Sequence, residues 1–353
     1  MKRAPRRHPN SYTTMTSRIL ILGGTRNLGH VTAVHLLQSG HNVTVLNRGV
    51  TRDELPDGIE RIRATRGDGS VMASIGGREF DSIIDLTTYN RADAMEAVEA
   101  FRNRAGRYVF ISSGQVYLVL KSAQRPFREQ EYAGDVMPAP PDGTDDFDSW
   151  KYGVDKRDAE DVFIAAFENE NFPVTTLRLP MVASERDHYG RLQGYFARMS
   201  DGEPLLIPDG RGLPIRHVYV HDVARFVGAL CGVTGGIGKA YNVSYGFSKV
   251  LSEYLALLGD VLDKEACTMI VPRAQLVEAQ LLPDCSPFSG AWMSELDASL
   301  ASEELIPGGF EYTSPEKYLP LILEDYRVRW IAQQTAPATY SQRDRELAFL
   351  SKL

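Results

Sequence analysis

Three residues have the types and spacing needed for proton transfer: Ser113, Tyr152 and Lys156. Tyr152 and Lys156 are four positions apart in WKYGVDK, so both face the same side of a helix. An ammonium group beside a phenol favours the phenolate and lowers the pKa of the tyrosine. Such a tyrosine can move a proton to or from a substrate oxygen, which a hydroxyl such as that of Ser113 can hold. Because Tyr-x-x-x-Lys pairs are common on helix surfaces, the interpretation depends on the surrounding elements.

Those elements alternate between apolar strands and amphipathic helices. A helix is expected over roughly 152–170, so Tyr152 and Lys156 would lie at its start, and Ser113 would end a strand. Strands too apolar to be half exposed, separated by helices, predict a Rossmann-type α/β fold with a doubly wound parallel sheet. The expected strands cover 18–22, 42–47, 80–88, 107–113 and 173–179.

A glycine-rich turn follows the first strand, in ILILGGTRNLGH at 19–30. Glycines there let the backbone turn tightly and approach a pyrophosphate, and the N-terminus of the next helix offers N–H groups to it. Arg26 occupies the place of the middle glycine of the usual Gly-x-x-Gly-x-x-Gly spacing. The alternative is a turn whose glycines serve only packing.

A second arginine, Arg48, follows Asn47 at the end of the second strand. A cofactor with a bare adenosine ribose usually meets an acidic residue at this place. A guanidinium group is better suited to a phosphate, which it can hold by two hydrogen bonds. Arg26 and Arg48 therefore predict NADP(H) as the preferred cofactor, with NAD(H) possible. The alternative is that Arg48 is solvated and Arg26 makes only local contacts.

From about Arg18 to about Trp330 the chain resembles the extended short-chain dehydrogenases/reductases of the NAD(P)-dependent epimerase/dehydratase type. The motifs that carry the resemblance are GGTRNLG, GD at 67–68, SSGQVY, YGVDK, LRLP at 177–180 and HVYVHDVA at 217–224. The resemblance implies that Ser113, Tyr152 and Lys156 form the catalytic triad. It also implies a smaller C-terminal lobe that binds a small-molecule substrate.

The resemblance further implies a cofactor site in which Asp68 lies near the adenine and Pro180 and Met181 pass the nicotinamide. Leu86 and Thr87 would line the cofactor after the fourth strand. The full set of expected cofactor-binding residues is Gly23, Thr25, Arg26, Asn27, Leu28, Gly29, Asn47, Arg48, Asp68, Leu86, Thr87, Ser112, Tyr152, Lys156, Pro180 and Met181.

The chain also departs from the family pattern. Nucleotide-sugar dehydratases carry an Asp-Glu pair after the catalytic Ser or Thr, whereas Gly114 and Gln115 stand here and neither transfers a proton at neutral pH. The Asn and the Gly-Pro turn that often follow the sixth strand are missing from LRLPMVASERD. A 4,6-dehydratase is therefore disfavoured and a nucleotide-sugar substrate is in doubt. Candidate substrate contacts are Gln115, Arg191, Tyr195 and Arg216.

Composition limits the remaining possibilities. A net charge of −7 counts against nucleic acid as the main partner, and three scattered cysteines fit a reducing cytoplasm. The sequence contains no apolar run long enough to span a membrane. His188, His217 and His221 lack the carboxylate support of a metal site, so no metal is expected.

The expected organisation is a disordered basic extension over 1–17 and a Rossmann domain over 18–180 with an insert or lid at 118–149. A lobe that binds mainly substrate follows over 181–335, with some elements returning to the Rossmann domain, and then a tail over 336–353. Helices 92–104 and 153–169 carry apolar stripes. The resemblance implies that they pair across a homodimer. The leading hypothesis is an NADP(H)-dependent oxidoreductase acting on a secondary alcohol or ketone. The alternatives are a redox-neutral epimerase of a sugar or nucleotide-sugar, and a non-catalytic NAD(P)- or RNA-binding homologue.

Overall fold

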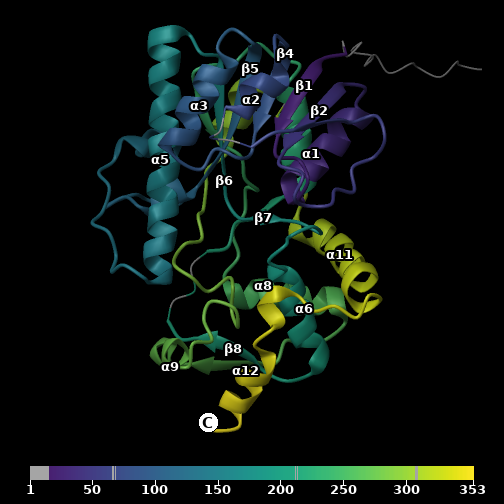
Figure 1. Cartoon of the computed structure of the whole chain (residues 1–353). Helices are drawn as coiled ribbons and strands as arrows, with labels where there is room; N and C mark the ends of the chain where they lie inside the picture. Colours follow the sequence, from purple (N-terminus) through teal and green to yellow (C-terminus); the bar gives the residue numbers. More distant parts are fainter. Residues whose placement is uncertain (1–15, 66, 68, 211, 213, 307–308) are drawn as a thin grey trace, which may run out of the picture.

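The computed structural model of the chain describes residues 16–65, 67, 69–210, 212, 214–306 and 309–353. Its centre is a seven-stranded parallel sheet in the order β10-β6-β5-β4-β1-β2-β3 (Figure 1). The strand order reverses between β1 and β4, which is the switch point of a doubly wound sheet. The predicted Rossmann-type fold class is thus confirmed. The strands are β1 (Arg18–Leu22), β2 (Asn42–Asn47), β3 (Glu60–Arg63), β4 (Phe80–Asp85), β5 (Ala105–Ser113), β6 (Val174–Leu179) and β10 (Ala240–Asn242).

The sheet is buried on both faces because its strands are apolar on both sides. In β1, Ile19 and Ile21 join one hydrophobic cluster while Leu20 and Leu22 join another, following the two-residue period of a strand. Helices α1 (Asn27–Gln38) and α7 (Val220–Leu230) cover the first face. Helices α2 (Ser70–Ile75), α3 (Arg91–Phe101) and α5 (Asp145–Glu170) cover the second.

Helix α5 begins at Asp145, seven residues before the predicted start, so Tyr152 and Lys156 lie in its interior. The Thr144 hydroxyl caps it by accepting a hydrogen bond from the Phe147 amide at 3.1 Å. Acidic residues in its first turn complement the positive end of the helix dipole. The Asp-rich stretch interpreted as the end of a loop is therefore the start of this helix.

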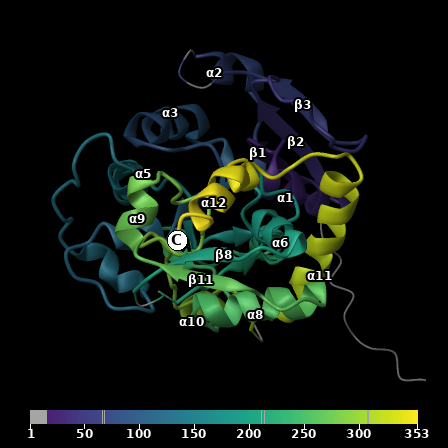
Figure 2. The same cartoon turned by 90° about the horizontal axis from the view of Figure 1, so that it is seen from below.

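A smaller lobe lies below the carboxyl edge of the sheet (Figures 1 and 2). It contains two-stranded parallel sheets, β7 (Val182–Ala183) with β9 (Val218–Tyr219) and β8 (Leu205–Pro208) with β11 (Thr268–Val271). Its helices are α6 (Arg191–Asp201), α8 (Leu251–Leu262), α9 (Arg273–Glu278), α11 (Pro315–Tyr326) and α12 (Arg343–Leu350). Between these elements the chain returns to the central sheet through α7, β10 and α10 (Ser299–Glu304), which contacts β10.

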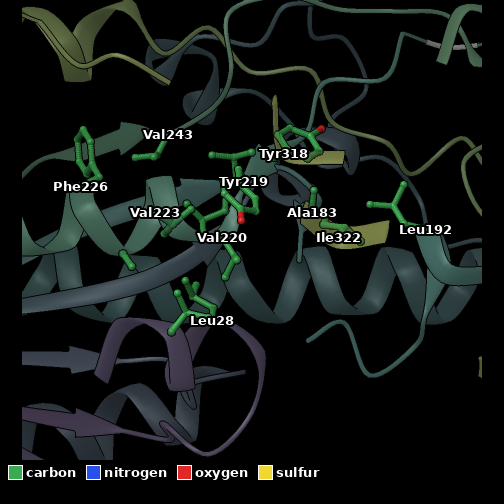
Figure 3. Packing of buried hydrophobic residues seen from close by; sticks show 14 of the residues in the cluster. Leu28, Ala183, Leu192, Tyr219, Val220, Val223, Phe226, Val243, Tyr318 and Ile322 are labelled. Carbon is green, nitrogen blue, oxygen red and sulfur yellow. The ribbon is translucent and has the colours of Figure 1, made fainter. Parts of the chain in front are cut away.

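One apolar cluster runs from the sheet into the lobe (Figure 3). It joins Leu28 of α1, Phe226 of α7, Leu192 of α6 and Ile322 of α11. Burying each such side chain contributes roughly 1.5–3 kcal/mol. The lobe is therefore built on the same core as one face of the sheet.

The segment expected as an insert or lid packs against the rest of the chain. It holds the 3-10 turn η1 (Glu129–Ala133), and α4 (Gln115–Leu118) precedes it. Phe127 is buried and stacks on Tyr117 with ring centroids 5.4 Å apart. Residues 336–353, expected as a tail, contain η3 (Ala338–Tyr340) and α12, whose Glu346 accepts from buried Arg198 at 2.5 Å.

The helix faces proposed for a dimer are mostly internal, since Ala94, Val98, Phe101 and Phe163 are buried against the sheet. Met95 and Ile164 are the exposed large apolar residues of α3 and α5. Residues 1–15 of the expected N-terminal extension lie outside the described residues. Within the part of the chain that is described, no helix is both long and apolar enough to cross a bilayer.

Candidate active site and cofactor cleft

The three predicted catalytic residues meet at the carboxyl edge of the sheet. Ser113 ends β5, and its hydroxyl lies beside the phenol of Tyr152 on α5. The backbone N–H of Gln115 donates to the same Ser113 oxygen at 3.2 Å, which fixes the hydroxyl. The Lys156 ammonium group lies 6.0 Å from the centre of the Tyr152 ring. The arrangement therefore brings together a phenol, a hydroxyl and a cation.

Lys156 is buried, and hydrogen bonds fix its ammonium group. Its Nζ donates to the carbonyl of Thr88 at 2.7 Å and to that of Ile111 at 3.0 Å. It also lies 4.9 Å from the centre of the Phe110 ring and 5.2 Å from that of Tyr89. These contacts offset the cost of removing a charge from water.

The pKa of Tyr152 differs from the expectation based on Lys156. Burial raises the pKa of this phenol to about 12, and the hydrogen bond from Ser113 acts in the opposite direction. Tyr89 and Tyr189 lie near enough to raise it further. In the polypeptide alone, desolvation therefore dominates the pKa of Tyr152.

The buried carboxylate of Asp85 fixes the turn that contains Thr88, whose carbonyl accepts a hydrogen bond from Lys156. Asp85, at the end of β4, accepts from the amides of Thr87 at 2.7 Å and Thr88 at 3.1 Å, and from the Tyr108 hydroxyl. The Thr88 hydroxyl donates to it at 2.5 Å. The sequence analysis missed Asp85, although a charged residue that directly follows the apolar pair Ile83-Ile84 at the end of a strand is a readable signal.

The glycine turn has the geometry of a dinucleotide cradle. Gly23 and Gly24 have φ values of +109° and +85°, and a Cβ on Gly24 would lie 2.8 Å from Val45. A Cβ on Gly29 would lie 2.6 Å from the Gly24 nitrogen, so helix and turn pack closely. Arg26 has φ −128° and ψ 155°, a conformation open to any residue. The arginine therefore stands where the backbone does not need glycine.

A pocket of about 390 Å³ lies beside this turn, between the ends of β1, β2 and β4. Gly23, Thr25, Asn47, Arg48 and Thr87 of the predicted cofactor set line it. The sequence analysis missed several other lining residues, among them Val50, Thr51, Ala64, Thr65, Val71, Tyr89, Asp93 and Glu96.

The polar lining suits a nucleoside. The Nδ2 atom of Asn47 is buried and has no hydrogen-bond partner within the described part of the chain. A ribose hydroxyl is a suitable acceptor for it. The glycine cradle, the pocket and this donor fit the adenosine part of a dinucleotide.

The two arginines line different pockets. Arg48 lines the adenosine pocket, whereas Arg26 lines a second one of about 330 Å³ at the start of α1 and donates to the Thr51 hydroxyl at 2.9 Å. Thr25 and Thr51 border both pockets, so the two cavities adjoin.

The other predicted cofactor residues lie in different places, some in the core beneath the glycine turn and others at or after the ends of β5 and β6. Leu28 and Gly29 are buried beneath the turn, and Leu86 packs against the same core. The Ser112 hydroxyl donates to buried Glu160 at 2.5 Å. Pro180 and Met181 follow β6, where the Met181 carbonyl accepts from Val218. Asp68 lies outside the described residues.

The four candidate substrate residues bond to neighbouring protein groups. Gln115 donates to the Ser149 carbonyl at 3.3 Å, and Arg191 pairs with Asp187 at 2.8 Å. Arg216 pairs with Glu295 at 3.2 Å. Tyr195 is fully buried, with its hydroxyl 3.3 Å from that of Ser286. Tyr89 and Tyr189, which the sequence analysis missed, lie near enough to Tyr152 to raise its pKa.

Gly114 is closely packed. A Cβ at this position would lie 2.7 Å from the Ser294 Cβ and 2.9 Å from Leu296. The aspartate that dehydratases carry after the catalytic hydroxyl therefore has no room at this position.

Solved structures with the same fold include an epimerase from Methanothermobacter thermautotrophicus. It aligns with a TM-score of 0.70 at 17% identity, covering 90% of this chain and 94% of that one. UDP-glucose 4-epimerase from Thermotoga maritima, in complex with UDP-glucose, aligns with a TM-score of 0.69 at 19% identity, covering 88% and 98%.

Two curated proteins are related in sequence. The 2′-dehydrokanamycin reductase of Streptomyces kanamyceticus is 29% identical over 168 residues, which is 47% of this chain and 43% of the reductase. A chloroplast stem-loop binding protein of Arabidopsis thaliana is 23% identical over 242 residues, which is 64% of this chain and 58% of that protein. The matches thus span about half the length of these curated relatives.

Residues 19–244 match the family described as the NAD dependent epimerase/dehydratase family. This range runs from β1 through the glycine turn, Ser113, Tyr152 and Lys156 to the end of β10. The chain therefore belongs to the NAD dependent epimerase/dehydratase family.

Proposed function

We propose that this enzyme is an NADP(H)-dependent oxidoreductase that interconverts a secondary alcohol and a ketone on a small molecule. The observation that carries the proposal is that Ser113, Tyr152 and Lys156 come together, with the fixed Lys156 ammonium group 6.0 Å from the centre of the Tyr152 ring. These groups meet at the carboxyl edge of the sheet, where α/β enzymes bind their ligands.

Each residue has a defined task. Tyr152 donates its proton to the carbonyl oxygen in the reducing direction and removes it from the hydroxyl in the oxidising direction. Ser113 holds the same oxygen by a hydrogen bond. Lys156 stabilises negative charge on the phenol and, by family resemblance, orients the cofactor ribose. The nicotinamide supplies or accepts the hydride when the cofactor is bound.

The preference for NADP(H) is supported by the end of β2. The residues after this strand are Arg48 and Gly49, and Arg48 lines the adenosine pocket. The acidic lining residues Asp93 and Glu96 belong to α3, on another side of the pocket. A guanidinium group at the strand end suits a 2′-phosphate better than a bare ribose.

Net reduction is favoured over the other reactions of the family. The packing around Gly114 disfavours dehydration, since it leaves no room for the aspartate that this reaction uses. A relative whose name is 2′-dehydrokanamycin reductase supports a ketone as the substrate. For redox-neutral epimerisation the expected observation is NAD(H) that stays bound through purification.

The test is a titration of the purified protein with NADPH and NADH, followed by nicotinamide fluorescence. Wild type should bind NADPH more tightly, and Arg48→Ala should remove that preference without weakening NADH. Equal binding of both cofactors in wild type, or NAD(H) recovered from the purified protein, would contradict the NADP(H) assignment.

A further inference from the structure

The second pocket is built from four segments that are distant in sequence. Its walls come from the glycine turn 25–27, the loop 51–54 after β2, the loop 185–188 after β7 and residues 329–335 after α11. Figure 2 shows the last segment, in yellow, running from α11 toward α12. The pocket therefore lies where the sheet domain, the lobe and the C-terminal segment meet.

Four arginines line this pocket together with three carboxylates. The arginines are Arg26, Arg52, Arg186 and Arg329, and the carboxylates are Glu54, Glu185 and Asp187. Glu54 accepts from Arg186 at 2.9 Å and from Arg329 at 3.4 Å, so one carboxylate serves two guanidinium groups. Its side chain is 59% exposed, and ion pairs this exposed are weak enough to be exchanged for another anion.

The C-terminal contribution comes from a π-helical turn, η2 (Arg327–Ile331). Asp325 holds the Arg329 Nε at 2.6 Å, which orients the guanidinium group. Trp330 follows in the same turn and also lines the pocket. Its Nε1 is buried and has no hydrogen-bond partner among the residues that the structure describes, and the same is true of Oδ1 of Asn27, which also lines the pocket.

The location identifies the ligand group. The pocket contains Thr25, Arg26 and Asn27, at the N-terminus of α1. The first N–H groups of a helix lack partners within the helix and attract anions, and in this fold they receive the pyrophosphate of the dinucleotide.

We propose that Arg186 of the lobe and Arg329 of the C-terminal segment clamp the cofactor's pyrophosphate against the glycine turn, in exchange for Glu54. Trp330 supplies a further N–H donor. The clamp makes the lobe loop and the C-terminal segment part of the cofactor site. The inference rests on the proposed function for the dinucleotide, but it is independent of the 2′-phosphate.

This independence separates the two proposals. NADPH and NADH share the pyrophosphate, so loss of the clamp weakens both by the same factor. Loss of a contact with the 2′-phosphate weakens NADPH alone. Adenosine 2′-monophosphate has no pyrophosphate, so the clamp variants should bind it like wild type.

The experiment uses the full chain carrying Arg186→Ala or Arg329→Ala, with Arg327→Ala as the matched control. Arg327 belongs to the same π turn, is 55% exposed and lies 3.8 Å from Glu324. Equilibrium constants and dissociation rates for NADPH and NADH are measured by nicotinamide fluorescence and by displacement with excess NADP+. Each clamp variant should bind both cofactors about tenfold more weakly and release them faster, while the control is unchanged.

Glu54→Gln gives a test of opposite sign. If Glu54 competes with the pyrophosphate, this variant binds both cofactors several-fold more tightly. If Glu54 only holds the lobe loop in place, the variant binds both cofactors more weakly than wild type or equally well. That result overturns the proposed exchange of Glu54 for the pyrophosphate. A clamp variant that behaves like Arg327→Ala, or that loses NADPH alone, overturns the clamp. Wild type that binds neither dinucleotide overturns both the clamp and the proposed function.

Discussion

Lys156 and Arg48 are both cations at the carboxyl edge of the sheet, but their surroundings differ. Lys156 is 3% exposed and donates to two backbone carbonyls. Arg48 is exposed on the loop after β2, at the border of the adenosine pocket. The catalytic end of the cleft is therefore held by internal hydrogen bonds, and the phosphate end presents its cation to solvent.

The difference follows from what each cation must do. Proton transfer requires reacting groups within hydrogen-bond reach of each other, so the protein fixes them before substrate binds. A phosphate can order an exposed guanidinium group when it arrives, at a modest cost in side-chain entropy. Substitutions at the catalytic end should thus affect turnover or folding, and those at the phosphate end should affect affinity.

Tyr152→Phe tests the catalytic end and has the largest expected effect. It removes the transferable proton and the partner of Ser113, so turnover should fall by about 10³-fold, within the usual range for general acid/base residues. NADPH affinity should change little, because the phenol belongs to the other end of the cleft. Steady-state rates of NADPH oxidation with a panel of small-molecule ketones and a fluorescence titration measure the two quantities. Retained turnover would contradict the assigned role of Tyr152.

Arg178→Met tests whether the buried ion pair between Arg178 and Glu160 stabilises the catalytic end of the cleft. Arg178 and Glu160 are buried and paired at 2.5 Å, and Glu160 also accepts from Ser112 beside the catalytic serine. Removing the arginine leaves a buried carboxylate without its cation, so the free energy of unfolding should fall by about 3–5 kcal/mol.

Urea denaturation followed by circular dichroism measures this loss. The double variant Arg178→Met, Glu160→Met is the control, and it should recover much of the stability because no buried charge remains. A cost below about 1 kcal/mol for the single variant would show that this pair does not stabilise the site.

Much of the sheet side of the site was predictable from the sequence, because local patterns specify it. The ends of β1, β2 and β6 follow from apolar runs, and the Ser113, Tyr152 and Lys156 set follows from spacing and family resemblance. The start of α5 was predicted wrongly because the acidic run at Asp145 resembles a solvated loop. Such a run also favours the positive end of a helix dipole.

The lobe side was not predictable, because tertiary contacts define it. Tyr189 approaches Tyr152 from a loop after β7, and Arg329 reaches the glycine turn from a segment about 300 residues later in the chain. Tyr195 was a candidate substrate contact, yet it is buried in the lobe core with its ring centroid 5.1 Å from that of Phe288. No local pattern distinguishes these outcomes.

Arg48→Asp reverses the charge at the phosphate end and tests whether substitutions there change cofactor affinity. The carboxylate repels a 2′-phosphate and accepts hydrogen bonds from ribose hydroxyls, so NADPH should bind about 100-fold more weakly and NADH slightly more tightly. Arg91→Asp is the control, since it makes the same charge change at an exposed position that lines neither pocket. Equal losses for both cofactors would indicate a general electrostatic effect, and turnover with saturating cofactor should be unchanged.

The smallest predicted effect joins the two ends of the cleft through the pKa of Tyr152. Burial raises this pKa to about 12 in the polypeptide alone, so the phenol stays protonated below about pH 10. The oxidised nicotinamide carries a positive charge, which favours the phenolate, so NADP+ should lower the pKa by about one unit. NADPH has a neutral nicotinamide and should lower the pKa of Tyr152 less.

The measurement is the tyrosinate absorbance of wild type minus that of Tyr152→Phe, as a function of pH and in the presence of each cofactor. Equal shifts with both forms would assign the change to closure of the cleft around the cofactor, and a shift with NADP+ alone would place the nicotinamide charge beside the phenol.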